Sequence, residues 1–179
     1  GESDSVGIYL EAESGYNTIS NSIVRVGKAK SNGREQIAID GSSHNRIFGN
    51  RFYELQQGGI YLYRNSGESG KARHTAPSNN HIINNWFYYD KYDGDKGAVN
   101  IGSREGERFS FNGLDAIGTG SYDPPLGSRF YNGDLAYGNV VAHNRIVKRK
   151  VSSMIKQSHF SFNNRIFENT TVSSVFSSR

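Results

Sequence analysis

The repeat that decides the fold is clearest at residues 45–52, which read NRIFGNRF. The same pattern, Asn-x-apolar-x-x-Asn-x-(apolar or Thr), returns at residues 80–87 (NHIINNWF), 139–146 (NVVAHNRI) and 164–171 (NRIFENTT), with a degenerate copy at 17–24 (NTISNSIV). A second pattern, in which apolar and polar residues alternate, precedes each copy and starts at Ile8, Ile37, Ile60, Val99 and, more weakly, Ile155. Alternation with a period of two is typical of β-strands. The chain therefore predicts a two-strand unit repeated five times.

The spacing of the repeats predicts a solenoid. The leading Asn residues are separated by 28, 35, 59 and 25 positions, so the period stretches while both patterns keep their order. Stacked parallel strands place equivalent residues about 4.8 Å apart, which would let Asn45, Asn80, Asn139 and Asn164 hydrogen-bond to one another as a ladder. We therefore expect an all-β fold, a right-handed single-stranded parallel β-helix of about five turns (rungs), as one domain over residues 1–179. A β-sandwich would give no reason for Asn to recur at one offset.

The composition agrees with a thin core and limits the classes of partner. Apolar residues make up 35% of the chain, which suits a narrow column such as Ile47, Ile82, Val141 and Ile166 better than a broad core. The net charge is +4, from 21 Lys and Arg against 17 Asp and Glu, and the cations are scattered rather than gathered in a stripe. We therefore expect no nucleic-acid partner, whereas an acidic glycan would not be repelled. No run approaches 18 apolar residues, so no membrane-spanning helix is expected.

The repeat with its Asn ladder resembles the right-handed parallel β-helix of the pectate-lyase-like superfamily, and it is most similar to phage tailspike depolymerases and polysaccharide lyases. The resemblance implies a module outside the cell or on a virion surface that binds and cleaves a bacterial surface or acidic polysaccharide, as a glycoside hydrolase or a polysaccharide lyase. The competing interpretation is a non-catalytic receptor-binding or structural β-helix segment of a phage fibre or surface protein. No catalytic motif of one family matches these residues, so no site is transferred from a family.

Two insertions predict where a binding surface lies. The distance from the first strand to the following Asn is 8 or 9 residues in three repeats, but 20 from Ile60 to Asn80 and 40 from Val99 to Asn139. The extra residues, about 64–78 and 102–138, therefore leave the coil at one corner of rungs three and four. Insertions gathered on one face of a repeat protein commonly build its binding surface.

The candidate site lies beside these insertions. Alternation predicts that Tyr9, Glu11, Asp40, Tyr61 and Tyr63 face outward and form the floor of a groove. Glu11 and Asp40 on neighbouring rungs would suit the paired carboxyl groups of a retaining glycosidase, in which one acid donates a proton and the other attacks. The alternative is two solvated acids at the ends of strands.

A lyase would instead need a base and a cation beside a uronate carboxylate. Lys71, Arg73, His74 and Tyr63 could serve, and basic side chains from both insertions would form the wall of the groove. The predicted catalytic residues are Glu11, Asp40, His74 and Arg73, and the predicted substrate-binding residues are Tyr9, Tyr61, Tyr63, Arg64, Lys71 and Arg104.

Two further expectations concern metal ions and chain association. Asp90, Asp93 and Asp95 could offer oxygen ligands to Ca²⁺, but the run lacks the full EF-hand pattern, so an acidic turn and no cofactor are predicted. Neither end of the predicted coil carries an obvious cap, and open strand edges are normally covered. We therefore expect a fragment of a longer coil, or ends covered by partner chains as in a homotrimer.

Overall fold

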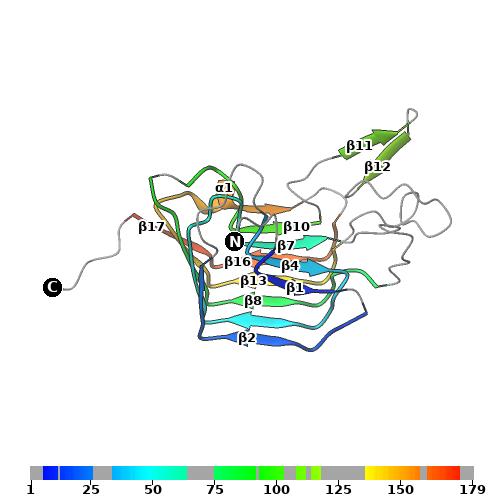
Figure 1. Ribbon diagram of the computed structural model, residues 1–179, viewed down its shortest axis with the longest axis horizontal. Helices are drawn as coiled ribbons and strands as arrows, with labels where there is room; N and C mark the ends of the chain where they lie inside the picture. The colour runs from blue at the N-terminus through cyan, green and yellow to red at the C-terminus, as the bar shows by residue number, and fades with distance from the viewer. Residues whose placement is uncertain are drawn as a thin grey trace.

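Three parallel sheets of five strands wind the chain into a parallel β-helix of about five rungs (Figure 1). The computed structural model describes residues 6–11, 13–25, 34–63, 75–91, 93–102, 108–111, 114–117, 136–157 and 161–173. The first sheet contains β1 (Ile8–Leu10), β4 (Ile37–Asp40), β7 (Ile60–Tyr63), β10 (Val99–Ile101) and β15 (Ile155–Gln157). The second contains β2 (Thr18–Ser20), β5 (Arg46–Phe48), β8 (His81–Ile83), β13 (Val140–Ala142) and β16 (Arg165–Phe167). The third contains β3 (Ile23–Arg25), β6 (Arg51–Tyr53), β9 (Trp86–Tyr88), β14 (Arg145–Val147) and β17 (Thr170–Val172).

Each rung has three strands, so the expectation of two strands per repeat is wrong. The Asn-x-apolar-x-x-Asn pattern holds two short strands joined by a bend, as between β5 and β6. The bend residue has a positive φ on every rung: Asn21, Gly49, Asn84, His143 and Glu168. Positive φ suits Gly and is tolerated best by Asn, Asp and His among the other residues. Only two residues separate the strands at each bend, such as Gly49 and Asn50 between β5 and β6, which is why the pattern reads as one strand.

The predicted Asn ladder is confirmed, and a second ladder runs beside it. The Asn45 backbone N–H and side-chain amide both donate to Oδ1 of Asn80, at 3.0 and 2.8 Å. The same pair of bonds links Asn80 to Asn139 and Asn139 to Asn164. The second ladder has the same geometry and contains Asn50, Asn85, Asn144 and Asn169. The ladders satisfy amide groups at the two corners of the coil, where an unpaired polar group would be costly.

The core is a narrow tube of stacked apolar columns. Ile37 pairs with Ile60, and Ile60 with Val99, in the register of the first sheet. In the second sheet, Ile47, Ile82 and Val141 form a fully buried column as predicted, but the predicted fourth member, Ile166, is 38% exposed because it lies on β16, the edge strand of this sheet. Phe52 stacks on Phe87 inside the third sheet with ring centroids 4.8 Å apart. Each rung thus adds a few apolar side chains to one continuous core, which explains how a chain with few apolar residues can fold.

Two elements lie outside this regular pattern. An antiparallel hairpin of β11 (Arg108–Phe111) and β12 (Leu114–Ile117) belongs to the second insertion and stands apart from the three sheets (Figure 1). A single helical turn, α1 (Val151–Met154), leads into β15 and explains the weak alternation of the fifth repeat. Among the described residues, no helix is long and apolar enough to cross a membrane.

Candidate functional site

The predicted floor of the groove faces outward as expected, but most of it is buried. Ile37 and Ile39 point into the core, and Ala38, Tyr61 and Tyr63 form a separate cluster on the outer side of the first sheet. Tyr9 is 39% exposed and Glu11 is exposed, whereas Asp40 and Tyr63 are fully buried and Tyr61 is 2% exposed. The expectation of an open lane at Asp40, Tyr61 and Tyr63 is therefore wrong.

Segments next to the first sheet explain this burial. Val6 packs against the outer cluster, and the segment before β4 supplies Arg34 and Glu35 to the side chain of Tyr63. The hydroxyl of Thr75 donates to the carbonyl of Gly41 at 2.5 Å and accepts from the backbone N–H of Glu13 at 2.9 Å. Alternation fixes the side on which a residue lies but not what covers that side.

Tyr9 and Asp40 form the first acid–phenol pair of the site. The Tyr9 hydroxyl donates a hydrogen bond to Oδ2 of Asp40. The parallel register pairs Tyr9 with Ala38, so the Tyr9 side chain reaches two residues along β4 to the carboxylate. A buried carboxylate needs such a partner, because leaving it without one in the protein interior costs free energy. The pair has one accessible member, Tyr9, and one buried member, Asp40.

Arg34, Glu35 and Tyr63 form the second polar group on this side. The Tyr63 hydroxyl donates to Oε1 of Glu35 at 2.7 Å, and Nη2 of Arg34 donates to that hydroxyl at 2.7 Å and to Oε1 at 3.1 Å. Burial by itself lowers the pKa of the Arg34 guanidinium. The hydrogen bond and the negative charge of Glu35 act in the opposite direction and help to outweigh burial, so the pKa lies above its usual value. The Arg34 side chain is 28% exposed, against 4% for Glu35.

The remaining predicted site residues lie outside the described part of the chain. They are Arg64, Lys71, Arg73, His74 and Arg104. Their roles as the wall of the groove and as lyase residues stay predictions. The first insertion leaves the coil directly after Tyr63, the last residue of β7, so it starts beside the polar groups just described.

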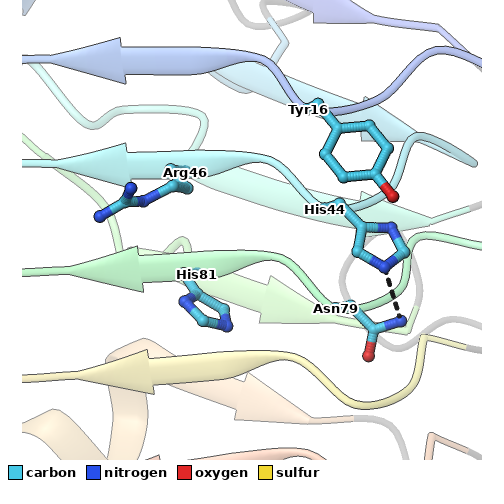
Figure 2. A pocket seen from close by; sticks show the side chains of 5 residues that line it. All are labelled: Tyr16, His44, Arg46, Asn79 and His81. Atoms are coloured by element: carbon cyan, nitrogen blue, oxygen red, sulfur yellow. Dashed lines mark hydrogen bonds between the residues drawn. The ribbon is translucent and has the colours of Figure 1, made fainter.

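A groove of about 670 Å³ opens on the outer side of the second sheet (Figure 2). Five side chains line it: Tyr16, His44, Arg46, Asn79 and His81. Three of them occupy equivalent bends on rungs one to three, each directly before an Asn of the first ladder and each at positive φ. The rings of Tyr16 and His44 stack with centroids 4.8 Å apart, and Asn79 lies 3.5 Å from Nε2 of His44. Arg46 and His81 are paired in the register of β5 and β8.

The acidic turn after β9 pairs with an arginine. Oδ2 of Asp93 accepts from the backbone N–H of Asp90 at 3.0 Å, and Nε of Arg149 lies 3.4 Å from Oδ1 of Asp95. Arg149 also donates to the carbonyl of Asp93 at 2.9 Å. Within the described ranges, no group of three His, Asp or Glu side chains is arranged to hold a metal ion. Asp93 and Asp95 therefore belong to an acidic turn that the Arg149 side chain holds through an ion pair and a hydrogen bond to the backbone.

Sequence reasoning missed Arg34, Glu35 and the lining of the groove. Arg34 and Glu35 precede β4 in a segment without any repeat pattern, so nothing in the sequence singled them out. The groove had a usable signal, because aligning the repeats on their first Asn places Tyr16, His44 and Asn79 in one column and Arg46 and His81 in another. His44 and His81 were not among the predicted site residues.

Comparisons of the chain with protein-family models, with curated proteins and with solved structures find no match.

Proposed function

We propose that the chain binds an acidic polysaccharide and cleaves it on the outer side of the first sheet. The observation that carries this proposal is the Tyr9–Asp40 pair, in which an accessible tyrosine donates its hydroxyl hydrogen to a buried carboxylate. A tyrosine held in this way can accept a proton from a substrate while its own proton moves to the carboxylate. The resemblance to polysaccharide lyases and tailspike depolymerases points in the same direction, and an extracellular or virion-surface location is part of the proposal.

The arrangement favours elimination over the paired-acid hydrolysis that Glu11 and Asp40 suggested. Tyr9 would take the proton from the carbon that bears the uronate carboxylate, and Asp40 would take the Tyr9 proton. The electron pair left on carbon forms a double bond, the glycosidic C–O bond breaks, and the leaving oxygen receives a proton back from the Tyr9–Asp40 pair. The Arg34 side chain is 28% exposed, and its positive charge would stabilise the negative charge that develops on the uronate.

The test is an incubation with capsular, O-antigen and uronate polysaccharides. Ultraviolet absorbance of an unsaturated uronate is expected, together with new reducing ends, whereas reducing ends alone would indicate a hydrolase. Tyr9→Phe is expected to lower turnover by a factor of about 100 or more, since a positioned acid–base group contributes about that much. Tyr137→Phe is the matched control, because Tyr137 is 37% exposed, close to the value of Tyr9, and it stacks on Phe162 and bridges Ser78 and Phe162 outside the strands of the first sheet.

A non-catalytic module is the second candidate, and the burial of Asp40 and Tyr63 favours it. In that case the polar groups only fasten the segment before β4 to the coil. Binding of a polysaccharide without any cleavage product, with equal affinity for the parent and Tyr9→Phe, would support this candidate and overturn the catalytic one.

A further inference from the structure

The groove on the second sheet belongs to a different face from the Tyr9–Asp40 pair. We propose that it is a separate binding site for an anionic sugar unit, in which Arg46 and His81 hold the acid group. The site takes residues from three successive rungs, because Tyr16, His44 and Asn79 come from the bends before Asn17, Asn45 and Asn80. A ligand in it therefore lies along the axis of the coil (Figure 2).

The charge of the lining selects an anion. None of the five lining residues is acidic, and the three basic ones are Arg46, His44 and His81. Within the described ranges, no carboxylate forms an ion pair with Arg46, so its guanidinium is available to a ligand. The planar guanidinium matches the two oxygens of a carboxylate better than an ammonium would. His81 is its neighbour on the next rung and can donate a further hydrogen bond from a ring nitrogen.

The remaining lining residues select a sugar rather than a lone ion. The lining residues come from three successive rungs, which at about 4.8 Å per rung extend about 10 Å along the coil, longer than a single anion. Tyr16 is 80% exposed and its ring is held in place by stacking on His44, so it offers a rigid aromatic surface to the C–H groups of a sugar. Asn79 brings both an amide donor and a carbonyl acceptor for hydroxyl groups. The Asn79–His44 contact is long, at 3.5 Å, and leaves both groups able to bind a ligand.

The chain contains a matched control for Arg46. Arg165 occupies the equivalent position on the fifth rung, in β16, and it is also exposed. Both guanidinium groups lie over the ring of a phenylalanine two residues ahead, Arg46 at 5.5 Å from Phe48 and Arg165 at 5.1 Å from Phe167. Arg46→Ala and Arg165→Ala therefore remove the same charge and the same cation–π contact, but only the first change lies in the groove.

The test measures binding of uronate trimers, prepared from polygalacturonate and from alginate, to the full chain by calorimetry and by NMR of the histidine rings. At least one trimer is expected to bind, with a Kd that rises about tenfold or more in Arg46→Ala and stays unchanged in Arg165→Ala. The ring signals of His44 and His81 should move, whereas those of His143, which lies 3.0 Å from Glu168, should not. Methyl esterification of the trimer should weaken binding by a similar factor.

Four outcomes would overturn the proposal. They are binding of no trimer, equal losses in the two arginine variants, equal affinity for the methyl ester, or displacement of the trimer by inorganic phosphate at equal concentration, which would indicate a site for any anion. Binding is measured on trimers and does not depend on cleavage. Loss of trimer binding in Arg46→Ala with unchanged cleavage by the Tyr9–Asp40 pair would support two separate sites.

Discussion

The outer sides of the first and second sheets differ, although both sheets are built from five short parallel strands with the same alternation. In β5 and β8 of the second sheet, the outward Arg46 and His81 are exposed. In β4 and β7 of the first sheet, every residue is buried on both sides. The difference follows from neighbouring segments, because Val6, Arg34 and Glu35 contact the outer side of the first sheet, while Arg46 and His81 on the second sheet stay exposed.

This comparison shows that the outer sides of two sheets in the same coil can differ in their surface chemistry. The second sheet presents its outward side chains directly to solvent, so its surface chemistry can be read from the columns of the repeat. The first sheet is covered, and its outward positions hold a polar and aromatic layer of Tyr9, Asp40 and Tyr63. A solenoid can therefore bind a ligand on an open side and build a more enclosed site on a covered one.

The largest expected effect tests what both sides share, the Asn ladder. Asn80→Ala should lower the free energy of unfolding by about 3–5 kcal/mol, because each buried group left without a partner costs about 1–3 kcal/mol. The change removes the acceptor of the Asn45 backbone N–H and side-chain amide, and it removes the donor to Oδ1 of Asn139. Urea unfolding measures the loss.

Asn79→Gly is the control for that measurement. Asn79 is the preceding residue, it is exposed, and its φ of 55° is one that glycine adopts without strain. Gly138 occupies the equivalent position on the next rung. A small change in Asn79→Gly beside a large one in Asn80→Ala would show that the ladder, and not asparagine in general, stabilises the corner. Similar changes in both variants would contradict the ladder as a main source of stability.

The next effect tests close packing at the start of the first sheet. A Cβ atom on Gly59 would lie 2.3 Å from the carbonyl oxygen of Ala98 on the next rung and 3.0 Å from the ring of Phe87. Gly59→Ala should therefore cost about 1–3 kcal/mol, the usual range for overpacking. Gly94→Ala, where the added atom meets nothing within 4 Å, should change stability by less than about 0.5 kcal/mol. Equal thermal unfolding of the two variants would show that the rungs can move apart.

The fold could be predicted from the sequence because its main determinants are local and repeated. Each repeat contains an Asn at position i, an apolar residue at i+2 and a second Asn at i+5. The two Asn residues join the two ladders, the apolar residue joins the core column, and five copies of the repeat make the pattern visible in the sequence. The third strand of each rung could not be seen, because only two residues, such as Gly49 and Asn50, separate it from the second strand. The burial of Tyr63 depends on Arg34, Glu35 and Val6, which follow no repeat. Non-repeated contacts are therefore what the sequence pattern cannot supply.

A smaller effect tests whether the Arg34–Glu35–Tyr63 group only covers the first sheet or also takes part in cleavage. Tyr63→Phe removes the hydroxyl that donates to Glu35 and accepts from Arg34, while Glu35 keeps its direct bond to Arg34. The expected loss is about 1–2 kcal/mol, because two hydrogen bonds are lost and each contributes on the order of 0.5–1 kcal/mol net. The loss should show in chemical unfolding, and Tyr137→Phe should show none beyond about 0.5 kcal/mol. A loss of polysaccharide cleavage without any loss of stability in Tyr63→Phe would mean that the Arg34–Glu35–Tyr63 group serves the reaction rather than the cover.

The smallest effect is a dependence on alkaline pH that comes from the corner between the third and first sheets. Tyr89 is 1% exposed, and its hydroxyl donates to the carbonyl of Lys96 at 2.6 Å. Burial raises the pKa of Tyr89 far above its usual value near 10, and burial also raises the pKa of Tyr88. The folded chain thus keeps the Tyr89 proton at a pH where the unfolded chain has begun to lose it. Stability is fully present below about pH 10 and falls as the pH rises further, because deprotonation then favours the unfolded state.

For Tyr89 alone, the loss between about pH 8 and about pH 10.5 should be just under 1 kcal/mol. Urea midpoints at these two values measure it, and each protein is compared only with itself, so the bond to Lys96 that Tyr89→Phe lacks does not enter the difference. The parent should lose more stability than Tyr89→Phe over this interval, since the variant has removed the group while Tyr88 remains in both. An equal fall in the stability of the two proteins would show that water reaches Tyr89 and that it titrates in the folded state. The corner between the third and first sheets would then be as open to solvent as the outer side of the second sheet.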